Sequence, residues 1–124
     1  MGKRSFFDTM LELGKTKPEV RAVDAEKASF TYAPDLAQAT KQLFEMGEPA
    51  GIYHLPNSGA ATWYGATKKL FELAGIKTSL SPAHPEDFPR PAKRPAFSVL
   101  QNTKFPPLRS YEEALREYVS ELNA

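Results

Sequence analysis

Residues 51–75, GIYHLPNSGAATWYGATKKLFELAG, carry the clearest structural signal in the sequence, because a strand pattern is followed by a turn and then by a helical pattern. Residues 51–55 are strand formers, and residues 56–59 are all turn formers. Thr62 then precedes apolar residues at helical spacing that stop at Gly75, so we expect a helix capped by these two residues. A strand, a turn and a helix in this order favour an α/β protein.

Helical and extended patterns alternate along the rest of the chain. Apolar residues from Phe6 follow a helical stripe that Gly14 should end, and Pro34 suits the first turn of a second helix. Ser110 and Glu113 have the spacing of a capping box at the start of the last helix. The predicted elements are helix 6–14, strand 20–24, helix 34–46, strand 51–55, helix 62–75, strand 77–82, a proline-rich extended arm 82–107 with a short strand at 98–100, and a C-terminal helix at about 110–122. This order predicts an α/β fold, or α+β in isolation, in a single domain of residues 1–124.

The composition excludes several classes of protein. The 124 residues include 16 basic and 15 acidic side chains, so a formal net charge of +1 predicts no nucleic-acid partner. The chain has no cysteine, which excludes disulfides, thiolate metal sites and a cysteine nucleophile. No apolar run approaches the length of a membrane span, and the first residues lack the apolar core of a signal peptide. We therefore expect a cytoplasmic protein with no membrane partner.

Tyr64 and Lys68 lie four residues apart, which is the spacing of the catalytic pair in short-chain dehydrogenases. The same spacing joins surface neighbours on a great many helices that have no catalytic role. A reductase also needs a glycine-rich turn between a strand and a helix to hold the dinucleotide, and the seven glycines never form that pattern. We therefore interpret Tyr64 and Lys68 as a helix-surface pair.

The other titratable residues carry equally weak signals. The chain has two histidines, His54 and His84, and neither has a carboxylate at metal-site spacing, so we expect no metal ligands. His54 is expected to be a packed or hydrogen-bonded strand residue. Glu86 and Asp87 are adjacent, so their side chains diverge, and a helix start or solvated loop explains them better than a catalytic pair. We expect no catalytic residue in this chain.

The proline-rich arm is the exception. It holds Arg90, Lys93 and Arg94 between prolines, which lose little further entropy when the arm becomes ordered. Guanidinium groups held in fixed positions suit bidentate contact with phosphate. The alternative interpretation is a solvated basic loop.

RPAKRPAFSVLQNTK, residues 90–104, resembles the C-terminal signature of the dTDP-4-dehydrorhamnose reductases, which are extended short-chain dehydrogenases. The stretches 20–39, 51–75 and 108–119 also resemble that family, in the same order along the chain. The resemblance implies that the chain is the C-terminal, substrate-binding portion of a Rossmann-like enzyme, without its dinucleotide-binding half.

In the family, the glycine-rich NADPH loop and the catalytic Tyr-x-x-x-Lys lie in that other half. The resemblance therefore implies no cofactor in this chain and NADPH in the complete enzyme, which reduces a dTDP-4-keto-6-deoxy-L-hexulose to dTDP-L-rhamnose. The chain departs from the family pattern at residues 28–31, where Ala-Ser-Phe-Thr replaces Gly-Ser-Pro-Thr, and at Gln101, which replaces an aspartate.

The resemblance also implies which residues bind the dTDP-sugar. Related nucleotide-sugar enzymes place an arginine at this point in the arm, so Arg90 is the first choice for the diphosphate contact. Arg94 is the second choice, with anchoring of the arm as its alternative role. Ser29 and Phe30 lie in the loop that approaches the substrate in the wider family.

Three interpretations of the chain stay open. It is the nucleotide-sugar-binding part of a reductase, a non-catalytic binding or regulatory module that keeps the substrate-domain fold, or one piece of a split enzyme that needs a separate Rossmann half. The departures at residues 28–31 and Gln101 mildly favour the regulatory module. A strand at residues 51–55 would also leave an unpaired edge and an apolar face, so we expect a homo-oligomer.

Overall fold

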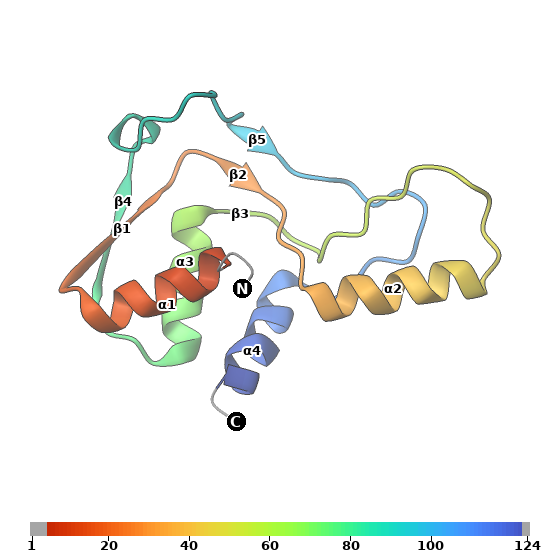
Figure 1. The fold of residues 1–124 in the computed structure, drawn as a ribbon, viewed down its shortest axis with the longest axis horizontal. Coiled ribbons are helices and arrows are strands. Elements are labelled where there is room, and N and C mark those ends of the chain that lie inside the picture. Colours follow the sequence, from red (N-terminus) through yellow and green to blue (C-terminus); the bar gives the residue numbers. More distant parts are fainter. Residues whose placement is uncertain (1–4, 123–124) are drawn as a thin grey trace.

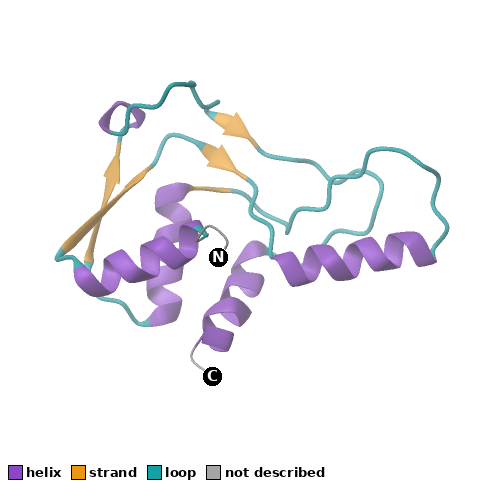
Figure 2. Cartoon of the chain, viewed as in Figure 1, coloured by secondary structure: helices purple, strands orange, loops and turns teal. Residues whose placement is uncertain are grey.

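Two small sheets and four α-helices make up residues 5–122, the part of the chain that the computed structural model describes (Figures 1 and 2). This mixture confirms the predicted α/β class. In chain order the elements are α1 (Phe6–Thr16), β1 (Glu19–Val23), β2 (Lys27–Ala28), α2 (Ala33–Glu45), β3 (Ala61–Thr62), α3 (Trp63–Ala74), β4 (Ser79–Ala83), the 3-10 helix η1 (Pro85–Asp87), β5 (Phe97–Ser98) and α4 (Tyr111–Leu122).

The two sheets bring together segments that are distant in the sequence. β1 and β4 form a parallel pair in which Val20 lies opposite Leu80, and they run side by side in Figure 1. A parallel pair needs a long crossover connection, and this one includes α3, which packs on both strands. The second sheet has the order β3-β2-β5, with β2 antiparallel to β3 and parallel to β5. It therefore places the arm, through β5, alongside β2.

Helix α3 lies at the centre of the core. Its Leu70 has no exposed surface and its Phe71 is 4% exposed, and the helix packs against α1, α4 and the β1–β4 pair. Burial of a leucine or phenylalanine side chain contributes about 1.5–3 kcal/mol relative to exposure. The buried cluster that fixes these elements is Leu11, Val20, Leu70, Phe71, Leu115 and Val119.

Three of the predicted helix caps are confirmed. The hydroxyl oxygen of Thr62 accepts a hydrogen bond from the Gly65 N–H at 3.1 Å at the start of α3. Gly75 ends that helix with φ of +70°, a left-handed conformation in which a side chain would be strained. At the start of α4, the Ser110 hydroxyl accepts a hydrogen bond from the Glu113 N–H at 3.1 Å.

The predicted stop of α1 at Gly14 is wrong, since the helix continues to Thr16. Gly14 serves close packing instead. A Cβ atom at this position would lie 3.0 Å from the Phe71 ring and 3.1 Å from Ile76, so any side chain here would require these neighbours to shift. Glycine at a helix end and glycine at a helix contact give the same sequence signal.

The strand predicted at residues 51–55 is also wrong. These residues form no strand, because no other segment within residues 5–122 lies alongside to complete a hydrogen-bonded ladder. Leu55 and the following Asn57 are nevertheless buried, so the end of the segment is held in place. A strand pattern in a sequence predicts a conformation, but a strand also requires a partner.

The arm differs in detail from its predicted bounds. Pro82 belongs to β4, where it lies opposite Ala22, so the irregular part of the arm begins after Ala83. The arm's own strand is β5, one residue earlier than the predicted segment 98–100. In the described part of the chain, none of the helices is long and apolar enough to cross a membrane.

Candidate functional site

Backbone hydrogen bonds hold the arm against β2. The Lys27 N–H donates to the carbonyl oxygen of Ala96 at 2.8 Å, and the Leu100 N–H donates to the Ser29 hydroxyl at 2.9 Å. The hydroxyl of Ser29 therefore binds the arm at Leu100, two residues after β5. These hydrogen bonds hold residues 96–100 of the arm in place and so restrict the positions of the arginines that precede them.

Arg90 and Arg94 line two adjoining cavities of about 490 Å³ and 370 Å³, which have both arginines and Phe88 in common. The larger cavity has an apolar wall formed by α1, β1 and the start of α3. Its lining residues on that side are Phe6, Met10, Leu13, Ala22, Val23 and Trp63. Guanidinium groups thus face aromatic and aliphatic side chains across one cavity, an arrangement that suits a ligand with both a phosphate and a flat apolar part.

The two arginines differ in how their charge is compensated. Arg90 Nη1 lies 3.4 Å from Oε1 of Glu26, a residue that is only 6% exposed. Arg94 is exposed and forms no ion pair or hydrogen bond within residues 5–122. Arg94 is therefore the cation that is free to meet a phosphate, whereas Arg90 already shares its charge with a buried carboxylate. The resemblance implies Arg90 as the first choice for the diphosphate contact, and the order of the two arginines stays a prediction.

A third arginine closes the same cavity from β1. Arg21 Nη2 pairs with Oδ2 of Asp87 at 2.9 Å, which ties β1 to η1 near the beginning of the arm. A hydrogen bond from the His84 backbone N–H, together with the Arg21 guanidinium, holds the pKa of Asp87 below its usual value. The ionised Asp87 thus neutralises Arg21.

Phe30 and Trp63 belong to one aromatic cluster. The Trp63 ring lies 4.7 Å from the Phe6 ring and 5.5 Å from the Phe30 ring, with an interplanar angle of 88° to Phe30. Phe30 also stacks at 5.4 Å from Tyr111, so it lies behind Trp63 and lines neither arginine cavity. The structure therefore brings Arg90 and Arg94 together, while Ser29 and Phe30 support the walls.

The remaining titratable residues lie away from this cavity. Tyr64 and Lys68 make no hydrogen bond with each other in the described structure, and neither lines the arginine cavities. The expectation of a packed His54 in a strand is wrong, since the residue is exposed and outside any strand. Across residues 5–122 no three histidine, aspartate or glutamate side chains group as metal ligands do.

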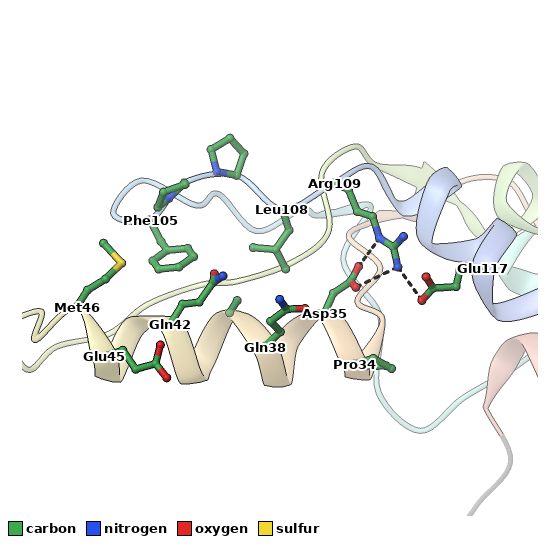
Figure 3. A pocket seen from close by; sticks show the side chains of 13 residues that line it. Pro34, Asp35, Gln38, Gln42, Glu45, Met46, Phe105, Leu108, Arg109 and Glu117 are labelled. Carbon is green, nitrogen blue, oxygen red and sulfur yellow. Dashed lines mark hydrogen bonds and ion pairs between the residues drawn. The ribbon is translucent and has the colours of Figure 1, made fainter. Parts of the chain in front are cut away.

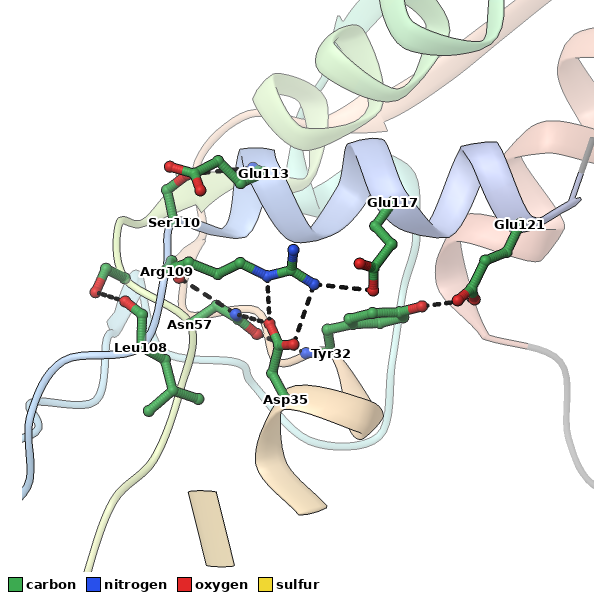
Figure 4. A network of polar contacts seen from close by, with 10 residues as sticks. Tyr32, Asp35, Asn57, Leu108, Arg109, Ser110, Glu113, Glu117 and Glu121 are labelled. Atoms are coloured by element: carbon green, nitrogen blue, oxygen red, sulfur yellow. Dashed lines mark hydrogen bonds and ion pairs between the residues drawn. The ribbon is translucent and has the colours of Figure 1, made fainter. Parts of the chain in front are cut away.

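A larger cavity of about 810 Å³ lies between α2 and residues 105–109 (Figure 3). Its arginine, Arg109, is already occupied: Nε and Nη2 bind the two Asp35 oxygens at 2.8 and 3.1 Å, and Nη2 also binds Glu117 at 3.0 Å (Figure 4). Two carboxylates bind one guanidinium, so this cavity offers no free cation to a phosphate.

The described residues do not fit a nicotinamide dinucleotide. Such a cofactor places its phosphates on a glycine-rich turn between a strand and a helix. Here β3 runs directly into α3, and the connections from β2 to α2 and from β5 to α4 contain no glycine. No step that uses the cofactor can be assigned to these residues.

The fold is that of the C-terminal portion of an extended short-chain dehydrogenase. The chain belongs to the RmlD substrate binding domain family, whose model matches residues 1–124. It is 39% identical over 124 residues to the spore coat polysaccharide biosynthesis protein SpsK of Bacillus subtilis, and this match covers 97% of the chain and 43% of SpsK.

Two solved structures show the same fold. A dTDP-4-dehydrorhamnose reductase from Clostridium acetobutylicum superposes with a TM-score of 0.92 at 34% identity, covering 98% of this chain and 45% of that one. The dTDP-4-dehydrorhamnose reductase from Bacillus anthracis, solved in complex with NADP, superposes with a TM-score of 0.87 at 31% identity. This match covers 97% of this chain and 44% of that one. The chain thus spans less than half the length of the relatives it matches.

Sequence reasoning missed the wall that faces the arginines. Trp63 lies within a helical pattern and Arg21 within a strand pattern, and neither pattern indicates that the two residues line one cavity. Glu26 gave no signal, because its burial beside Arg90 depends on the arm folding back over β2. The single tryptophan, placed one residue after a helix cap, was the available clue.

Proposed function

We propose that this chain is the nucleotide-sugar-binding portion of a dTDP-4-dehydrorhamnose reductase-like protein. The observation that carries the proposal is Arg94, an uncompensated guanidinium opposite the apolar wall that contains Trp63 and Met10. A nucleoside diphosphate has matching parts, since its phosphates are anionic and its base is flat and largely apolar. Membership of the family supports this choice of ligand.

In this proposal Arg94 makes the main contact with the diphosphate of a dTDP-sugar, and Arg90 makes a weaker one because it shares its charge with Glu26. The base lies against the wall formed by α1, β1 and Trp63. Ser29 holds the arm at the cavity, and Phe30 holds the Trp63 ring in position.

The complete enzyme would be a cytoplasmic oxidoreductase that reduces the 4-keto group of a dTDP-4-keto-6-deoxy-L-hexulose with NADPH and yields dTDP-L-rhamnose. The part played by this chain is to bind and orient the nucleotide-sugar. The hydride donor and the proton donor belong to a dinucleotide-binding half, which is either joined to this portion or supplied as a separate chain.

The single tryptophan makes the proposal testable in the native chain, because Trp63 gives one indole N–H signal in an NMR spectrum. Titration with dTDP should shift that signal in a saturable way, and dTMP should shift it with lower affinity. Inorganic phosphate alone should leave the indole signal unchanged, since phosphate does not reach the apolar wall. A Trp63 signal that does not respond to dTDP at millimolar concentration would contradict the proposed site.

A further inference from the structure

A cavity of about 300 Å³ lies between α1, α4 and the loop that precedes α2. It has no lining residue in common with the arginine cavities, so it is a separate site. Its aromatic lining residues come from α1, from the loop at residues 30–32 and from α4. They are Phe7, Phe30, Tyr32, Tyr111 and Tyr118, and we call them the aromatic cage. A cavity of this size accommodates a small organic molecule.

The rings of the aromatic cage form a continuous series of contacts. The Phe30 ring lies 5.4 Å from the Tyr111 ring and 5.7 Å from the Phe7 ring. The Tyr118 ring lies 6.5 Å from the Phe7 ring and 6.4 Å from the Tyr32 ring. The face of an aromatic ring carries partial negative charge. Several rings around one space are the arrangement by which proteins bind quaternary or methylated ammonium groups.

The charge at this cavity is negative. Among the described residues that line it, Asp8 is the only one with a charged side chain. Its carboxylate accepts hydrogen bonds from the Tyr118 hydroxyl and from the Ser5 backbone N–H, the latter at 3.3 Å. The N-terminal end of α1 carries about half a positive charge, which the full charge of Asp8 outweighs. In the first turn of α4, Glu112 and Glu113 oppose the partial positive charge of that helix end. An anionic ligand therefore does not suit the cavity.

Two tyrosines of the aromatic cage donate hydrogen bonds to carboxylates. The Tyr118 hydroxyl donates to Asp8, and the Tyr32 hydroxyl donates to Glu121 at 2.7 Å (Figure 4). The hydrogen bond to Glu121, together with burial, raises the pKa of Tyr32 to about 12, so this phenol keeps its proton and continues to donate. Donation to a carboxylate polarises the phenol and adds electron density to its ring, which strengthens the attraction of the ring for a cation.

We propose that the aromatic cage binds a small organic cation with an alkylated ammonium group. The alkyl groups pack against the rings, while the ring faces and the Asp8 carboxylate stabilise the positive charge. A bare ammonium group or a metal ion is strongly hydrated, and aromatic rings do not replace its hydration shell. Both polar atoms of the nearby Asn57 side chain are already hydrogen-bonded, to the Tyr32 N–H and to Asp35 and the Arg109 carbonyl oxygen. The inference does not depend on the nucleotide-sugar site.

Titration of the native chain with choline chloride tests the proposal, with the aromatic signals of the NMR spectrum as the readout. Choline should shift the ring signals of Tyr111 and Tyr118 in a saturable way, and sodium chloride at the same concentration should not. The neutral isostere 3,3-dimethyl-1-butanol has the shape of choline without its charge, and it should bind roughly five-fold more weakly or worse. Equal affinity for the two molecules would show that the cavity is merely apolar and would overturn the proposal. The absence of a saturable choline shift would overturn it as well.

Two variants with matched controls test the location of the site. Asp8→Asn removes the charge with little change of shape, and it should weaken choline binding roughly five-fold while changing binding of the neutral isostere little. Glu72→Gln removes the same charge from an exposed position on α3 and should change neither affinity. Phe7→Leu removes one ring and keeps an apolar side chain, so it should weaken choline more than the isostere, whereas Phe44→Leu at the exposed end of α2 should have no effect. Choline binding that Asp8→Asn and Phe7→Leu leave unchanged, or that the control variants weaken equally, would contradict a site in the aromatic cage.

Discussion

Arg109 binds both carboxylate oxygens of Asp35, with Nε 2.8 Å from Oδ2 and Nη2 3.1 Å from Oδ1 (Figure 4). The pair joins the first turn of α2 to the residue that precedes the α4 cap, two points 74 residues apart in the sequence. Asn57, which is 1% exposed, donates to Asp35 at 2.8 Å and to the Arg109 carbonyl oxygen at 3.2 Å. The arrangement fixes the first turn of α2, whereas Phe44 and Met46 at the other end of the helix are exposed.

Replacing Arg109 by alanine should destabilise the protein by roughly 2 kcal/mol, because it removes charge-assisted hydrogen bonds and leaves the half-buried Asp35 uncompensated. Urea unfolding followed by circular dichroism measures the loss. Lys41→Ala is the control, since the Lys41–Glu45 pair on α2 is exposed and 3.8 Å long, and it should change stability by less than about 0.5 kcal/mol. Equal losses in the two variants would contradict this role of Arg109.

Stability should also fall in acid through Asp35. Burial raises the pKa of this carboxyl, but hydrogen bonds from Arg109 and Asn57 outweigh burial and leave the pKa below its usual value. A lowered folded-state pKa contributes stability that is complete above the unfolded-state pKa of about 3.9 and is lost as the pH falls through the folded-state pKa. Urea unfolding between about pH 5 and pH 2 should therefore show a smaller acid-dependent loss in Asp35→Asn than in the native protein. The same loss in both proteins would show that Asp35 does not carry this effect.

Gly14→Val should destabilise the contact between α1 and α3 by about 1–3 kcal/mol, because the new side chain would overlap the Phe71 ring. Thermal unfolding provides the measurement, and Phe71→Leu in the same chain should recover part of the loss. If Gly14→Val alone leaves the melting temperature unchanged, the close approach of the two helices is not as described.

The chain alone should self-associate, because Phe44, Met46 and Ile52, at the end of α2 and in the segment after it, are largely exposed to water. Sedimentation velocity at high micromolar concentration should show a dimer or a higher oligomer. Phe44→Asp should shift the chain toward monomer, and Leu122→Asp should not. A clean monomer of the native chain at that concentration would count against these exposed apolar side chains as a site of association.

The chain alone should not oxidise NADPH in the presence of a dTDP-4-keto-6-deoxy sugar, because residues 5–122 offer no dinucleotide turn. The assay follows absorbance of the reduced nicotinamide. Turnover that disappears in Tyr64→Phe would show that Tyr64 and Lys68 are a catalytic pair after all.

The sequence predicted the helices well because their signals are local. Apolar spacing and caps such as Thr62 and Gly75 lie within one or two turns of each other. The prediction of a strand at residues 51–55 failed, because a strand depends on a partner strand that its own residues do not reveal. The prediction that α1 ends at Gly14 failed, because the choice between a helix end and a helix contact depends on Phe71, 57 residues later in the chain.

The cationic side of the site was also predictable, since prolines around Arg90 and Arg94 mark a stiff basic arm. The different charge compensation of the two arginines was not predictable. It depends on Glu26, which folding brings to Arg90 across 64 residues, and on an apolar wall formed by three separate elements. Tertiary packing alone determines that Arg90, and not Arg94, lies next to a carboxylate.

Calorimetric titration of dTDP into the native chain and three arginine variants measures whether Arg94 contacts the diphosphate. Arg94→Ala should weaken dTDP binding about ten-fold to a hundred-fold, the equivalent of a charge-assisted contact worth roughly 1.5–3 kcal/mol. Arg90→Ala should weaken dTDP binding less than Arg94→Ala does. The control variant Arg116→Ala, on the exposed side of α4, should leave dTDP binding unchanged. In Arg94→Ala, the affinity for dTMP should fall less than the affinity for dTDP. If dTDP and dTMP bind equally well and Arg94→Ala changes the affinity of neither, the arm is a solvated basic loop and the nucleotide-sugar does not bind at Arg94.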